Sequence, residues 1–265
     1  MSRDAPSNNS LWIFFALIFA LSVPLWIIGA ATGLLLPLGL PFGALMLFNP
    51  LIAAALLVYR HDGEIGLKTL LWGSVDPRGI TAIWFAMAIF LMPIVLVLEY
   101  GFLRISGLAV PLPDFSVSSA ILLFAVFVVA AIGEEAGWQG YAARLLQNKH
   151  SALMASLILG MVWAIWHIVP FLQAGRLPSW IWWQCLTMLP ARIIIVWLSN
   201  NTGRSILIAV LFHTMMNLSE FLFPNDGSHY DPLVTFVLFA FVATIVTLLW
   251  QPKTLTRFQY PRCPK

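Results

Sequence analysis

The sequence has very few charged residues: Asp, Glu, Lys and Arg together occupy only 9% of its 265 positions. Hydrophobic residues fill 60% of the positions, and the mean hydropathy is +0.89. A chain with so little charge cannot cover a water-soluble surface, because soluble domains carry about a quarter charged residues. These numbers exclude disordered, fibrous and nucleic-acid-binding classes and indicate an integral membrane protein. The net charge of +3 therefore bears on membrane orientation.

Cysteine is also scarce. Cys185 lies within an apolar run and Cys263 lies near the end of the chain, and these two residues cannot form a disulfide framework. A prenylation signal needs a cysteine four places from the end, whereas only Pro264 and Lys265 follow Cys263. The cysteines therefore indicate neither a disulfide-stapled fold nor a lipid anchor.

Long apolar runs take the place of the missing charge, and runs of about 20 apolar residues are typical of membrane-spanning helices. Eight candidate spans follow, at about 11–33, 38–58, 80–98, 117–147, 151–172, 179–199, 204–223 and 232–250. The first is too long for a signal peptide and has no small-residue cleavage site after it. The sequence shows no repeat and no long linker, so we predict an all-α transmembrane helical bundle forming a single domain over 1–265.

Positive charge is distributed unevenly between the predicted loops. With the N-terminus inside and alternating spans, eleven of the fourteen Lys and Arg are cytoplasmic, two are outside, and Arg192 lies within a span. This bias predicts that both termini are cytoplasmic. The cytoplasmic set is Arg3, Arg60, Lys68, Arg78, Arg144, Lys149, Arg204, Lys253, Arg257, Arg262 and Lys265; the external pair is Arg104 and Arg176.

Ionisable and amide side chains at membrane depth are functional candidates, because they are costly there unless they face a partner or a cavity. The main set is Glu134, Glu135, His167, His213 and Asn217, with Arg192 as an expected structural counter-ion and Glu220 as an expected solvated group near a span end. Each also has a structural interpretation: a polar helix end for the glutamates, a packed core imidazole for His167, and interhelical hydrogen bonding for His213 and Asn217.

Helical spacing assigns these side chains to faces. Adjacent Glu134 and Glu135 are about 100° apart around a helix, which predicts different environments for the two carboxylates. His213 and Asn217 are four residues apart and share a face, so both can donate hydrogen bonds toward one point. A carboxylate beside an imidazole in an apolar site can activate water, and Glu134 with His167 fits that need.

Three motifs resemble those of the CPBP family of intramembrane proteases, which includes the Ras-converting CAAX endopeptidase and bacteriocin-immunity homologues. They read EEAGWQG from Glu134, WAIWH ending at His167, and HTMMN from His213 to Asn217, in the family's order and on separate spans. The resemblance covers about 117–220. It implies a catalytic core there, with spans 117–147, 151–172 and 204–223 surrounding a polar cavity that we expect to open toward the cytoplasm.

The resemblance also implies residue roles. Glu134 and His167 would activate the hydrolytic water, His213 and Asn217 would form the oxyanion hole, and Glu135 would support them. The sequence departs from the family at Gln139, where the family has an arginine that would pair with Glu135. In this chain Glu135 is either protonated or paired with another arginine, Arg144 or Arg192.

Two other functions compete with a metal-free peptidase. A zinc-dependent version would use Glu134, His167 and His213 as ligands, although the sequence has no HExxH motif. A non-proteolytic protein would act by binding, as in bacteriocin immunity, or as a proton-coupled transporter. The favoured peptidase needs no cofactor. Its expected partners are membrane lipid and a peptide or membrane-protein substrate in a bacterial cytoplasmic membrane, and the sequence indicates no oligomeric state.

Overall fold

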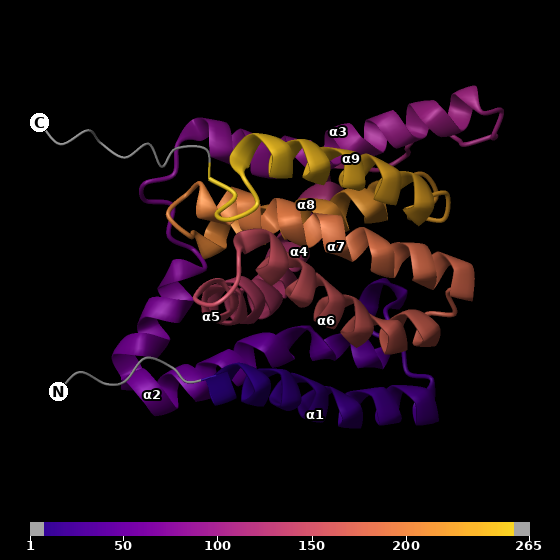
Figure 1. Ribbon diagram of the computed structural model, residues 1–265. Coiled ribbons are helices and arrows are strands. Elements are labelled where there is room, and N and C mark those ends of the chain that lie inside the picture. Colours follow the sequence, from indigo (N-terminus) through magenta and orange to yellow (C-terminus); the bar gives the residue numbers. More distant parts are fainter. Residues whose placement is uncertain (1–7, 257–265) are drawn as a thin grey trace, which may run out of the picture.

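The computed structural model describes residues 8–256, and its regular structure is helical (Figure 1). The helices are α1 (Asn8–Thr32), α2 (Asn49–Gly73), α3 (Ala82–Ile105), α4 (Val117–Gly137), α5 (Ala143–Gln147), α6 (Ala152–Gln173), α7 (Pro178–Asn200), α8 (Ile206–Leu222) and α9 (Pro232–Trp250). Short 3-10 segments, η1 (Pro37–Gly39) and η2 (Phe42–Phe48), precede α2, and the π-helical turn η3 (Trp138–Ala142) joins α4 to α5. Cys263 and four of the basic residues used for orientation lie outside the described residues: Arg3, Arg257, Arg262 and Lys265.

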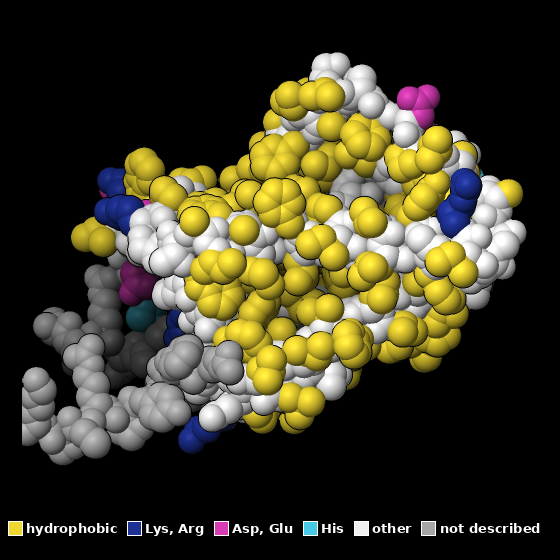
Figure 2. All heavy atoms as spheres, turned by 90° about the horizontal axis from the view of Figure 1, so that it is seen from above, with side chains coloured by type: hydrophobic (Ala, Val, Ile, Leu, Met, Phe, Trp, Pro, Cys, Tyr) yellow, Lys and Arg dark blue, Asp and Glu magenta, His cyan; other side chains and the backbone are white. Residues whose placement is uncertain are grey.

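Seven of the described helical segments are long and apolar enough to cross a membrane, and the shorter apolar helix α8 accompanies them. Figure 2 shows hydrophobic side chains over most of one face, with the visible charged side chains toward its two ends. The predicted all-α bundle is therefore confirmed, and the protein is a multi-pass membrane protein. Figure 1 shows that α1 begins and α9 ends at the same end of the bundle.

The second predicted span, 38–58, has the wrong bounds. The chain forms η1 and η2 over its first part, and α2 then continues to Gly73. Gly63 interrupts α2 with a positive φ of 67°, a conformation that glycine adopts at little cost. Beyond Gly63 the helix turns away from the bundle direction (Figure 1). Apolar content alone does not show this break, although the Asp62–Gly63 pair is a turn signal in the sequence.

α7 is the central helix of the bundle. In its apolar window 72% of residues are buried, against 22–44% in the other spans. A helix surrounded by protein can carry polar groups that lipid would exclude, provided that they find partners. This position explains how the span 179–199 accommodates Arg192, whose side chain is fully buried.

Serine caps begin the three helices that carry the predicted site residues. The hydroxyls of Ser116, Ser151 and Ser205 accept hydrogen bonds from backbone N–H groups at the starts of α4, α6 and α8. Such caps satisfy amide groups that a helix leaves unpaired at its first turn. They fix where each helix begins, and with it the depth of the polar residues further along.

Small residues bring α4 against η2 and the start of α2. A methyl group at Gly133 would lie 2.9 Å from the carbonyl oxygen of Leu47, and one at Gly137 would overlap the Pro50 carbonyl. Glycine is therefore needed on both sides of the acidic pair. The π-helical turn begins directly after Gly137, where Ala143 N–H donates to the Trp138 carbonyl five residues back. Single π-helical turns occur frequently at functional sites.

A buried serine joins α1 to α2 and α6. Ser22 Oγ accepts hydrogen bonds from Asn49 Nδ2 at 2.9 Å and from Trp166 Nε1 at 2.8 Å. It donates its own proton to the Ile18 carbonyl at 2.7 Å. These bonds hold Trp166, the residue before His167, and so fix the rotation of α6 about its axis.

Candidate active site

Four helices bring the predicted site residues together. Glu134 and Glu135 come from α4, His167 from α6, His213 from α8, and α7 adds Arg192. Glu134 lies near the middle of the 117–147 segment, about 20 Å from the Gln147 end at 1.5 Å per residue. The acidic pair therefore lies deep in the bundle and not at an end of this segment, so its position gives no support to the expected cytoplasmic opening.

Glu135 forms the most strongly paired part of the site. Both of its oxygens accept hydrogen bonds from Arg192 Nη1, at 3.1 and 2.8 Å, and Oε1 also contacts His213 Nδ1 at 2.9 Å. The side chains of Glu135 and Arg192 are both 0% exposed. Arg192 is thus the arginine that pairs with Glu135, as the sequence allowed. The contact with an ionised carboxylate requires that His213 Nδ1 carry a proton.

Glu134 has different partners, as predicted from its angular separation from Glu135. Its Oε2 accepts a hydrogen bond from Trp163 Nε1 at 2.8 Å and a longer one from Trp138 Nε1 at 3.4 Å. Its Oε1 faces His213 Nε2 at 4.0 Å, too far for a direct hydrogen bond. The two indoles therefore fix one oxygen, and the other keeps its capacity to accept a proton.

His167 contacts the same tryptophan. Its Nδ1 donates to the Trp163 carbonyl at 2.9 Å, which leaves Nε2 as the free ring nitrogen. The rings of Trp163 and His167 meet edge to face at 5.4 Å, and those of Trp163 and His213 at 5.2 Å. Among the described residues no ion pair within 4.0 Å joins His167 to Glu134, whose Oε1 instead lies 4.0 Å from His213 Nε2.

Asn217 and Gln139 make fewer contacts. Asn217 follows His213 by one helical turn and is half-buried. Gln139 lies in the π-helical turn and is 2% exposed, and its Oε1 has no hydrogen-bond partner among the described residues. The structure thus gathers Glu134, Glu135 and His213 tightly, and Asn217 lies one helical turn beyond His213.

A metal would need Glu134, His167 and His213 to point at one centre. Among the described side chains no group of three or more His, Cys, Asp or Glu has that arrangement. His213 uses Nδ1 for Glu135, and the indoles of Trp163 and Trp138 occupy Glu134 Oε2. The side chains as arranged do not fit a zinc site, so the chemistry below is derived from the residues alone.

A second polar cluster, beyond the predicted site, joins four helices and a loop. Glu99 of α3 accepts hydrogen bonds from Thr235 Oγ1 of α9 and from the Asp231 backbone N–H. In the loop before α9, the Tyr230 hydroxyl donates a hydrogen bond to Gln184 Oε1 of α7 at 3.0 Å. Burial raises the pKa of the Tyr230 phenol, so the hydroxyl keeps its proton and remains a donor.

Glu220 belongs to the same cluster. Its Oε2 accepts a hydrogen bond from Gln184 Nε2 at 3.4 Å, and its side chain is half-buried. The expectation that Glu220 is simply solvated is therefore wrong. Sequence reasoning missed Glu99 and Gln184 because each lies alone in an apolar run, without a motif.

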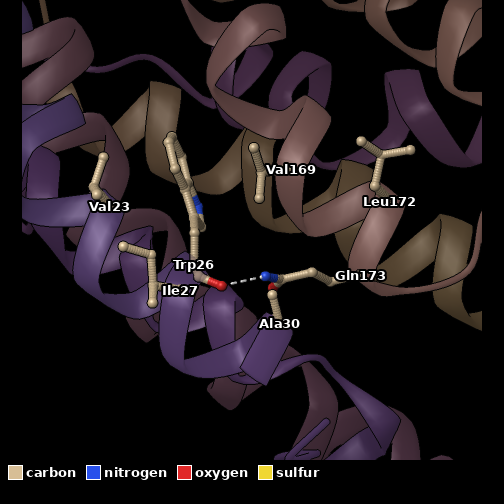
Figure 3. A pocket seen from close by; sticks show the side chains of 7 residues that line it. All are labelled: Val23, Trp26, Ile27, Ala30, Val169, Leu172 and Gln173. Atoms are coloured by element: carbon tan, nitrogen blue, oxygen red, sulfur yellow. Dashed lines mark hydrogen bonds between the residues drawn. The ribbon is translucent and has the colours of Figure 1, made fainter. Parts of the chain in front are cut away.

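An apolar groove of about 420 Å³ opens between α1 and α6. Figure 3 shows its lining side chains and the hydrogen bond from Gln173 Nε2 to the Trp26 carbonyl, 2.7 Å long. The lining includes Val169 and Leu172, on the same helix as His167. A hydrophobic chain in this groove would run alongside the helix that carries one of the site imidazoles.

Comparison with known proteins gives one family match and two relatives. Residues 116–219 match the family described as "Type II CAAX prenyl endopeptidase Rce1-like". "CAAX prenyl protease 2" of Methanococcus maripaludis is 34% identical over 116 residues, which cover 40% of this chain and 42% of that protein. "Lysostaphin resistance protein A" of Staphylococcus haemolyticus is 26% identical over 183 residues, covering 67% and 48%. The chain thus aligns with less than half the length of either relative.

Proposed function

From the premise that residues 116–219 belong to the CPBP family of proteases, we propose that the protein is an intramembrane endopeptidase. The observation that carries the proposal is the arrangement of Glu134. Two indole N–H groups hold its Oε2, while Oε1 faces the imidazole of His213 at 4.0 Å, in the middle of a helical bundle. A carboxylate fixed in this way is suited to act as a general base.

In the proposed mechanism a water lies between Glu134 Oε1 and His167 Nε2, and it donates one hydrogen bond to each of them. Glu134 removes one proton as the water oxygen attacks the peptide carbonyl carbon, forming the tetrahedral intermediate. The C–N bond then breaks, and Glu134 gives the proton to the departing amine. No covalent enzyme intermediate forms. Trp163 keeps the carboxylate oriented through both transfers, because its indole holds Oε2 at 2.8 Å.

The oxyanion of the intermediate is proposed to receive hydrogen bonds from His213 Nε2 and the Asn217 amide. Because His213 Nδ1 donates to Glu135, the Nε2 atom can donate only when the ring is an imidazolium. The site supplies the balancing charge, since Glu134, Glu135, Arg192 and imidazolium His213 sum to zero. A neutral cluster is the arrangement that a low-dielectric interior favours.

The substrate class is proposed to be a hydrophobic or membrane-embedded peptide, including prenylated CAAX ends. The name of the Methanococcus relative supports prenylated CAAX ends as substrates. The groove between α1 and α6 supports a hydrophobic substrate, because it presents apolar side chains on the helix that carries His167. A multi-pass position in a cell membrane, with both termini cytoplasmic, completes the proposal.

The test uses the purified full chain in proteoliposomes and a quenched fluorescent CAAX peptide, farnesylated or left unmodified. Wild type is expected to cleave the farnesylated peptide, and His167→Ala is expected to lose cleavage while its thermal unfolding profile is unchanged. Glu220→Gln serves as a matched control, because it neutralises a half-buried carboxylate outside the proposed site. Full cleavage by a folded His167→Ala protein would contradict the proposed site.

A non-proteolytic resistance function is the second candidate, favoured by the name of the Staphylococcus relative. A protein that acts by binding keeps its protective phenotype when Glu134 is replaced by Gln, whereas a protease loses it. Measuring lysostaphin survival of cells that produce each variant separates the two.

A further inference from the structure

Resting on the proposed peptidase function, we propose that Arg192 is a positioning residue. It supplies from α7 the positive charge that the family's EExxxR motif carries on the helix of the acidic pair. In this chain the motif arginine is Gln139, and the charge on Glu135 is balanced from another helix. Arg192 then acts on the reaction through Glu135 and His213.

The first support is the Glu135–Arg192 contact. Both side chains are fully buried, and one guanidinium nitrogen reaches both carboxylate oxygens, at 2.8 and 3.1 Å. A buried carboxylate without a cation is strongly destabilising, so an ion pair at this depth needs both members. Among the described residues the basic groups within 4.0 Å of Glu135 are Arg192 and His213.

The second support is that neighbouring residues accommodate the arginine. On α6, Gly160 leaves room: a methyl group there would lie 3.3 Å from Arg192 Cβ and 3.1 Å from Leu189 Cα. The guanidinium carbon lies 4.4 Å from the centre of the Trp163 ring, within the range of a cation–π interaction. The indole of Trp163 also donates a hydrogen bond to Glu134, so Arg192 contacts both Glu135 and the residue that orients Glu134.

The third support is the fate of the alternatives. Gln139 Oε1 has no hydrogen-bond partner among the described residues, and its side chain is a neutral amide that brings no positive charge to Glu135. Arg144 is exposed, and its Nη2 donates to the Arg204 carbonyl at 3.4 Å. Neither residue replaces the pairing that Arg192 provides.

The consequence is electrostatic. With Arg192 present, Glu135 is balanced and its Oε1 can still accept the His213 Nδ1 proton. The negative charge of Glu134 can then be balanced by the positive charge of an imidazolium at His213. Removing the guanidinium leaves two carboxylates for one imidazolium, and Glu135 would take up a proton and cease to orient His213. The structure therefore assigns Arg192 an effect on kcat, with little effect on KM.

The experiment transfers the charge back to the motif. Arg192→Gln should lower kcat for the farnesylated CAAX peptide by about 100-fold, the scale of losing one oxyanion-hole donor. The kcat of the double variant Arg192→Gln/Gln139→Arg should recover to within about tenfold of the wild-type value. An arginine at position 139 lies four residues after Glu135, on the same helix face, and can pair with it. Gln139→Arg alone should remain active, and Arg144→Gln, the matched arginine control, should match wild type.

Each outcome decides. Wild-type kcat in folded Arg192→Gln overturns the proposal, and so does a double variant that fails to recover, whether it is folded and inactive or does not accumulate. If Arg192→Gln alone does not accumulate, recovery of both folding and activity in the double variant supports the proposal. If wild type cleaves no peptide, the proposed function fails separately, and thermal unfolding of the same variants still tests the pair. In thermal unfolding the double variant should have a higher midpoint than Arg192→Gln. Equal midpoints would overturn the proposal that Arg192 takes the place of the motif arginine.

Discussion

Trp163→Phe tests whether the indole of Trp163 orients the catalytic carboxylate. The change removes the 2.8 Å hydrogen bond to Glu134 Oε2 and keeps an aromatic ring against His167 and His213. A hydrogen bond to a charged group is worth about 1.5–3 kcal/mol. At about 1.4 kcal/mol per factor of ten, kcat should fall roughly 10- to 150-fold.

The assay is steady-state cleavage of the quenched farnesylated peptide in proteoliposomes, with kcat and KM measured separately. Trp138→Phe is the graded comparison, because its indole bond to the same oxygen is 3.4 Å long and should contribute less. We expect the loss in kcat to be larger for Trp163→Phe than for Trp138→Phe. Equal effects, or a fall confined to KM, would show that the indole of Trp163 does not orient the base.

Three further predictions concern the oxyanion hole, metal dependence and helix packing. Asn217→Ala should lower kcat by about 10²- to 10³-fold, the loss typical of one oxyanion donor, and unchanged kcat would remove Asn217 from the site. Exhaustive chelation should leave turnover intact; loss of turnover that added zinc restores would favour the metal version. Ser22→Ala should lower thermal stability, because Trp166 and Asn49 lose their shared acceptor, and an unchanged unfolding midpoint would contradict this packing role.

The helical bundle could be predicted from the sequence because length and apolarity alone identify spanning helices. The central position of α7 could not, because Pro190 and Arg192 weaken its apolar signal. In a bilayer that combination indicates a poor span, whereas in the middle of a bundle Arg192 has Glu135 as its partner. The break at Gly63 was missed because the span was judged by apolar content, although the Asp62–Gly63 pair is a turn signal.

The candidate site was predicted in its membership more than in its contacts. The motifs identified Glu134, Glu135, His167 and His213, and helical spacing separated the two carboxylates. Periodicity gives angles within one helix and no distances between helices, so it could not choose between Arg144 and Arg192 as the partner of Glu135. The hydrogen bonds of Trp163 and Trp138 to Glu134 were missed for the same reason, since tryptophans in apolar runs are ordinarily read as packing.

The central claim is that Glu134 activates the water that hydrolyses a peptide bond. Glu134→Gln keeps the shape of the side chain and an oxygen for the indole donors, so the variant should fold as wild type does. The most direct measurement is its turnover number beside wild type, at matched protein content in proteoliposomes. We predict a loss of at least about 10³-fold, within the range for removing a general base. Cleavage at the wild-type rate by the folded variant would contradict the account.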